Sequence, residues 1–83
     1  MLFMITQAHT PDTCPIDSGG SETLIDKSAQ GVKVKGRWGA WSHHKIWYLV
    51  EADDMECIQR FLDPGMKRAT STVEPVGEVP VQR

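Results

Sequence analysis

Residues 32–52, VKVKGRWGAWSHHKIWYLVEA, decide the fold because they read as two β-strands joined by a short turn. Side chains of different character alternate over Val32–Trp41, as they do in a strand with two unlike faces. Ile46–Ala52 is apolar on both faces up to Glu51, and residues 42–45 supply the turn. The stretch therefore predicts a β-hairpin.

The chain before the hairpin predicts one strand and one helix. Leu2–His9 is apolar and contains no breaker, which favours a strand. Residues 10–16 carry two prolines and read as a loop. Ser21–Gln30 then predicts a helix, with Gly31 at the position where a glycine commonly follows a helix end.

The chain after the hairpin predicts a second helix and a last strand. Asp53 is followed three residues later by Glu56, a spacing typical of a helix-capping box. An apolar face follows, and residues 63–65, DPG, end the helix. Lys67–Val76 alternates weakly as a strand, and residues 77–83 form a tail. The apolar face consists of Met55, Ile58, Phe61 and Leu62.

The element order β-α-β-β-α-β predicts an α+β, ferredoxin-like fold. With right-handed crossovers it gives a four-stranded antiparallel sheet in the order 4-1-3-2, with both helices on one face. The 83 residues leave room for one domain, which we expect to span residues 1–76.

The other face of this sheet needs a cover. The hairpin carries more large apolar side chains than two short helices can bury, and an exposed patch of that size is rare on a monomer. We therefore expect a homodimer with C2 symmetry, packed sheet to sheet. The side chains concerned are Trp38, Trp41, Trp47, Tyr48 and Leu49.

Charge and cysteine content narrow the class of protein. The net charge of −2 argues against a nucleic-acid partner, which would call for a basic face. The apolar start is too short for a signal peptide or a membrane span, so we expect a cytoplasmic protein that does not contact a membrane. In that compartment Cys14 and Cys57 are expected as free thiols.

Four segments carry a resemblance to a known superfamily. MLFMITQAHTP (1–11), IWYLVEADD (46–54), IQRFLDPG (58–65) and STVEPV (71–76) resemble the dimeric α+β barrel superfamily, and within it small bacterial and archaeal proteins of unknown function. The superfamily includes cofactor-free monooxygenases, isomerases, haem-binding enzymes and ligand-sensing domains. The resemblance therefore implies a fold and a dimer but selects no reaction.

Side chains that bind metals are expected to meet at one edge of the sheet. The first strand ends at His9, the hairpin turn holds His43 and His44, and the loop after His9 carries Cys14. Imidazole and thiolate are the ligands that zinc and similar transition metals prefer. Adjacent histidines point apart, so we expect one of the two to face the site. Cys57 belongs to the opposite edge and is excluded.

The number of ligands decides what such a site does. Three protein ligands leave a position for water or substrate, whereas four close the site and make it structural. Asp12 is a candidate for a further ligand or for orienting an imidazole. Three readings without metal remain open: a solvated turn beside a loop cysteine, Cys14 as a thiolate nucleophile activated by histidine, and histidine alone as a general base.

Aromatic and basic side chains suggest two further sites. Trp38, Trp41, Trp47 and Tyr48 are candidates for lining a pocket that takes a flat aromatic molecule, although packing in a core or dimer is the favoured explanation, because aromatic side chains dominate cores and interfaces. A basic stripe on the second strand protects a sheet edge or binds an anion. The stripe consists of Lys33, Lys35 and Arg37.

Three functions are compatible with these residues. The first is a metal-binding protein that acts on or senses a small molecule. The second is a metal-free enzyme, similar to a monooxygenase or isomerase, for an aromatic substrate. The third is a non-catalytic ligand-binding or interaction module.

Overall fold

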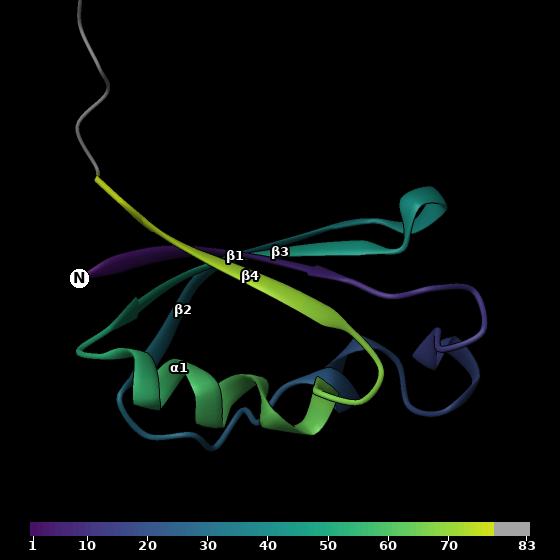
Figure 1. The fold of residues 1–83 in the computed structure, drawn as a ribbon, viewed down its shortest axis with the longest axis horizontal. Coiled ribbons are helices and arrows are strands. Elements are labelled where there is room, and N and C mark those ends of the chain that lie inside the picture. Colours follow the sequence, from purple (N-terminus) through teal and green to yellow (C-terminus); the bar gives the residue numbers. More distant parts are fainter. Residues whose placement is uncertain (78–83) are drawn as a thin grey trace, which may run out of the picture.

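The computed structural model describes residues 1–77, which form a four-stranded antiparallel sheet backed by one α-helix (Figure 1). The strand order β2-β3-β1-β4 is the predicted one. Most of the predicted tail, from residue 78 onward, lies outside the described residues. The elements are β1 (Leu2–Ala8), β2 (Val32–Ala40), β3 (Lys45–Ala52), α1 (Met55–Leu62) and β4 (Thr70–Val76).

Helix α1 begins one residue later than the capping box suggested. Asp54, not Asp53, is the N-cap, and its Oδ1 accepts a hydrogen bond of 2.9 Å from the backbone N–H of Cys57. The helix buries Ile58 and Phe61 against the sheet. A 3₁₀ turn over Asp63–Gly65 then ends it, as the proline and glycine predict.

The predicted helix over Ser21–Gln30 is wrong, and a short 3₁₀ turn over Ser21–Leu24 takes its place. Gly19 and Gly20 both have positive φ, which bends the chain sharply just before this turn. Beyond it, the Asp26 carboxylate accepts hydrogen bonds from both the backbone N–H and the hydroxyl of Ser28, at 2.9 and 2.6 Å. Such local bonds stabilise a turn at the expense of a helix.

Residues 10–31 nevertheless lie on the same side of the sheet as α1 (Figure 1). Leu24 and Ile25 reach the core from this segment. The segment therefore covers the part of this sheet face where the helix over Ser21–Gln30 was predicted, while leaving more of the chain irregular. The core consists of Phe3, Ile5, Leu24, Ile25, Ile46, Tyr48, Val50, Ala52, Ile58 and Phe61.

A buried amide connects this segment to the sheet. Gln7 is fully buried, and its Nε2 donates to the carbonyl oxygen of Leu24 at 3.3 Å. Its Oε1 accepts a hydrogen bond of 3.2 Å from the hydroxyl of Tyr48. Gly65 lies against the same group, because a Cβ there would come within 2.5 Å of the Leu24 oxygen. These contacts fix residues 21–24 against β1 and β3.

The sheet face opposite α1 carries a group of large apolar side chains, and no element of residues 1–77 covers it. Strand alternation places every second residue of β1 and β3 on this face, and Trp38 of β2 pairs there with Trp47 of β3. Trp38 is 55% exposed and lies across Gly36. We call this surface the open face; its large apolar side chains are Leu2, Met4, Trp38, Trp47 and Leu49.

Candidate metal-binding site

Strand register brings His9 and His44 together. The β1–β3 pairing ends with Ala8 opposite Lys45, so the next residue of β1 and the preceding residue of β3 are neighbours. The backbone N–H of His9 donates to the carbonyl oxygen of His44 at 3.0 Å, which extends the ladder by one bond. Two residues that are far apart in the sequence are therefore held at one edge of the sheet.

The turn between β2 and β3 selects His44 over His43. Trp41–His43 form a 3₁₀ turn, after which His44 adopts the left-handed conformation with φ 54° and ψ 45°. Its backbone N–H donates to the carbonyl oxygen of Trp41 at 3.3 Å. The imidazole of His44 faces His9, whereas His43 is exposed and is not part of the cluster. The expectation that a single histidine of the pair faces inward is confirmed.

A turn after β1 returns Cys14 to the same place. The backbone N–H of Thr13 donates to the carbonyl oxygen of Thr10, and the Thr13 hydroxyl oxygen accepts from the backbone N–H of Thr10, both at 3.0 Å. Pro15 follows and is buried. Cys14 is left half-buried between this turn and the histidines. Asp12 is exposed and lies outside the cluster.

One donor atom from each of His9, Cys14 and His44 lies within 4.8 Å of the other two. The tightest pair is His44 Nδ1 and His9 Nε2, which are 3.3 Å apart. Two nitrogens bound to the same tetrahedral zinc at about 2.0–2.1 Å are about 3.3–3.4 Å apart. The imidazole pair therefore already has the spacing of two ligands on one ion.

The surroundings of His9 favour the neutral ring. Burial lowers the pKa of His9 below its ordinary 6.5, and the charges of His44 and Arg68 lower it further. Its Nδ1 is buried and finds no hydrogen-bond partner within residues 1–77. A neutral imidazole is the form that binds metal, since its free lone pair is the ligand.

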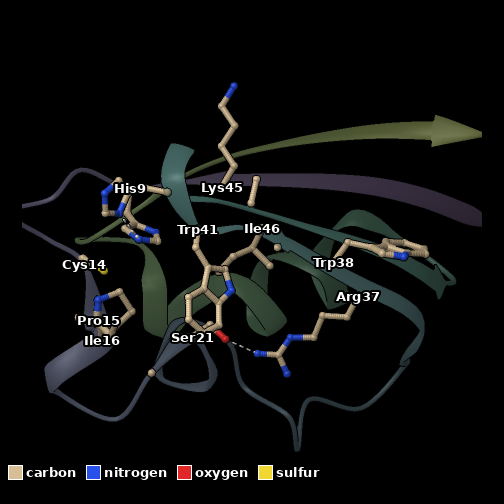
Figure 2. A pocket seen from close by; sticks show the side chains of 14 residues that line it. His9, Cys14, Pro15, Ile16, Ser21, Arg37, Trp38, Trp41, Lys45 and Ile46 are labelled. Atoms are coloured by element: carbon tan, nitrogen blue, oxygen red, sulfur yellow. Dashed lines mark hydrogen bonds between the residues drawn. The ribbon is translucent and has the colours of Figure 1, made fainter.

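The cluster forms one end of a pocket of about 560 Å³, a volume typical of small-molecule sites (Figure 2). Figure 2 shows His9 and Cys14 at one end, the Trp41 indole in the middle and the Arg37 guanidinium at the other end. The sequence predicts Arg37 only as part of a basic stripe that protects a sheet edge or binds an anion, and Ser21 as the start of a helix. The apolar part of the lining includes Pro15, Ile16, Trp41 and Ile46.

The aromatic residues predicted to line one pocket are separated by the sheet. Tyr48 is fully buried in the core, where its ring packs edge-on against Phe61 with centroids 5.7 Å apart. Trp47 lies on the open face. Trp38 reaches the rim of the pocket, but its indole turns away from it (Figure 2). The cause is strand alternation, because neighbouring residues of β3 point to opposite faces.

Comparisons with known proteins identify a family but no activity. A family model described as "Domain of unknown function (DUF3303)" matches residues 1–80. Neither a search of curated proteins nor a search of solved structures finds a match. Within residues 1–77, none of the helices has the length and apolar character needed to cross a membrane.

Proposed function

The chain belongs to the DUF3303 family of domains of unknown function, and we propose that it is a small-molecule-binding protein that holds a transition metal, preferably zinc, on His9, Cys14 and His44. The observation that carries the proposal is the imidazole pair at 3.3 Å with a thiol within 4.8 Å. Two nitrogens and one sulfur form a donor set that suits zinc.

The position of the cluster supports binding of a second molecule. Three protein ligands leave one position of a tetrahedral ion for water or a ligand. The cluster is part of the pocket lining, so a molecule in the pocket has access to that position. A metal there polarises an oxygen that it binds and lowers the pKa of bound water, which is the chemistry the site supplies when loaded.

Metal content and cobalt spectroscopy test this proposal. Protein prepared without an affinity tag is expected to contain close to one transition-metal ion per chain. Co²⁺ added to metal-free protein is expected to give the absorption of a tetrahedral ion with a thiolate ligand. Cys14→Ser should abolish the thiolate band, and Cys57→Ser, which changes the other free thiol, should preserve it.

Two results would refute the metal site. One is a protein that takes up no stoichiometric Zn²⁺ or Co²⁺ after metal-free preparation. The other is a cobalt spectrum that Cys14→Ser and Cys57→Ser change equally. Retained ligand binding in the same metal-free protein would then favour the metal-free enzyme or the non-catalytic module.

We further propose that the open face pairs two copies of the chain. Trp47 and Leu49 lie near its middle, and charged residues such as Lys45 and Glu51 lie at its ends along β3, which resembles the apolar centre and polar rim of an interface. Trp47→Lys should therefore yield a monomer in sedimentation experiments. Trp41→Lys, a matched change on an exposed indole away from this face, should leave the mass unchanged. A wild-type protein that sediments as a monomer at high concentration would refute the dimer.

A further inference from the structure

The pocket beside the metal cluster has an apolar middle and a cationic end. Trp41 is 85% exposed, an unusual amount for an indole, and its ring lies about 3.6 Å from the position that a Cβ on Gly39 would occupy. Ile16, at 68% exposed, adds a second large apolar surface to the lining. Two exposed apolar side chains beside one pocket offer a flat ligand ring a surface to stack on.

Arg37 at the far end is fixed in place and keeps free donors. One terminal nitrogen donates to the Ser21 hydroxyl, and the guanidinium lies 5.7 Å from the centre of the Tyr48 ring. A guanidinium has five N–H donors, so most of its hydrogen-bonding capacity is left for a ligand. Fixing the group in advance reduces the entropy lost on binding.

The charge of Arg37 is only partly balanced. Glu22 approaches it at 3.8 Å, but the same carboxylate lies closer to Lys27, at 3.1 Å. The Arg and Lys residues in the pocket lining are Arg37 and Lys45, and Lys45 extends away from the pocket (Figure 2). A single guanidinium directed into the pocket matches one carboxylate, which it binds with two parallel hydrogen bonds.

We infer that the pocket binds a small planar aromatic acid, with its carboxylate on Arg37 and its ring against Trp41. The opposite end of such a molecule lies at His9, Cys14 and His44. A hydroxyl there can occupy the open position of a bound metal, and this last contact alone depends on the proposed function.

Indole N–H signals in NMR spectra give a direct test. The chain has three tryptophans, and of these Trp41 faces the pocket while Trp47 lies on the open face, so Trp47 is the internal control. 4-Hydroxybenzoate added to metal-free protein is expected to shift the Trp41 signal in a saturable way. 4-Hydroxybenzamide has the same shape without the charge and should bind about tenfold more weakly or worse, since charge-assisted bonds are the strong ones.

Variants assign the carboxylate contact. Arg37→Gln should weaken 4-hydroxybenzoate to the level of the amide, while Lys45→Gln, which removes a charge at the rim, should bind as the wild type does. An unchanged Trp47 signal will show that Arg37→Gln is folded. Equal binding of acid and amide, no saturable Trp41 shift, or equal effects of the two variants would overturn the inference.

The same titration in the presence of Zn²⁺ separates this inference from the metal proposal. If both hold, zinc should tighten 4-hydroxybenzoate at least severalfold but leave benzoate, which lacks the hydroxyl, unchanged. If the metal site fails, binding of the acid to metal-free protein persists with its dependence on Arg37. If the pocket inference fails, zinc still binds while the Trp41 signal does not respond to either acid.

Discussion

The two cysteines lie at opposite ends of the sheet and have opposite surroundings. Cys57 lies in the first turn of α1, where the Asp54 carboxylate, chiefly by accepting a hydrogen bond from the thiol, raises the pKa of Cys57. Cys14 lies beside the imidazoles of His9 and His44. The raised pKa favours the protonated thiol of Cys57, whereas Cys14 has the two imidazoles beside it that would be its fellow ligands in the proposed metal site. Neighbouring groups, not exposure, distinguish the two, since both cysteines are half-buried.

These two ends of the sheet also differ in the residue that adopts the left-handed backbone conformation. Gly31 occupies this conformation opposite Cys57, at φ 84°, where glycine is the natural choice. His44 is the one non-glycine residue with positive φ in the part of the chain that the structure describes. A turn that would accept glycine or asparagine instead carries an imidazole aimed at His9. We call the end with Gly31 and Cys57 the packing end, and the end that carries the proposed site of His9, Cys14 and His44 the binding end.

The largest expected effect comes from a substitution at the binding end. Asparagine tolerates the left-handed backbone but lacks the imidazole, so His44→Asn removes a zinc ligand without straining the turn. Zinc affinity should fall about 100-fold or more, because losing a residue that only hydrogen-bonds to a metal ligand already costs about 10- to 100-fold. Competition with a chromogenic chelator measures this. His43→Asn is the matched control and should leave the affinity unchanged. Equal losses in both variants would exclude His44 as a ligand.

The second-largest expected effect comes from a substitution at the packing end. Gly31→Ala places a Cβ within 2.7 Å of Cys57 Sγ and forces a positive φ on alanine, so the free energy of unfolding should fall by about 2 kcal/mol. Urea unfolding of metal-free protein measures the change. Adding Cys57→Ala removes the clash but not the backbone strain, and should restore part of the loss. Zinc affinity should not change in any of these variants.

A smaller effect concerns the cap of α1. Asp54→Ala removes the side chain that accepts from the Cys57 N–H and should cost about 1 kcal/mol of unfolding free energy. Asp53→Ala should cost much less, because Asp53 is not the N-cap. The same urea experiment compares them, and a larger loss in Asp53→Ala would contradict the assigned cap.

The smallest effect is a pH dependence at the histidine end. Burial, followed by the charge of His44, lowers the pKa of His9 in the folded chain below 6.5. In the window just below pH 6.5 the unfolded chain therefore binds more protons, so stability is full above this window and falls as the pH drops through it. Urea midpoints of metal-free protein from about pH 7.5 to about pH 5 follow this. His9→Gln should flatten the slope and His43→Gln should not.

Sequence predicted the sheet better than the segment that closes the site. Apolar runs without breakers predicted β1 and β3, alternation predicted β2 and β4, and the capping pattern predicted α1, because each of these elements repeats one local signal along its length. Residues 17–31 carry only Leu24 and Ile25 into the core, and the Asp26–Ser28 bonds compete with helix formation. Two apolar residues are compatible with a helix and with a turn, so the sequence alone could not decide between these two structures.

For the site, the topology predicted the meeting of His9, Cys14 and His44, since strand ends that share an edge bring their next residues together. The sequence allowed anion binding by the stripe that contains Arg37, but it did not place Arg37 in a pocket with Trp41 and the histidines. The place of Arg37 opposite Tyr48 depends on a bulge between Val34 and Gly36, which shifts the register of β2 by one residue. A bulge has no reliable signature in a single sequence, so the faces of β2 beyond it were assigned without that shift.

The buried Gln7 restricts which substitutions this protein can accept during evolution. Its amide satisfies the Tyr48 hydroxyl and the Leu24 carbonyl oxygen together, deep in a dry interior. An aliphatic replacement would strand both groups, so Gln7 and Tyr48 are expected to vary only as a pair. Substitutions in the pocket wall can then accumulate and alter ligand preference, while this one amide keeps residues 21–24, which border the pocket at Ser21, anchored to the scaffold.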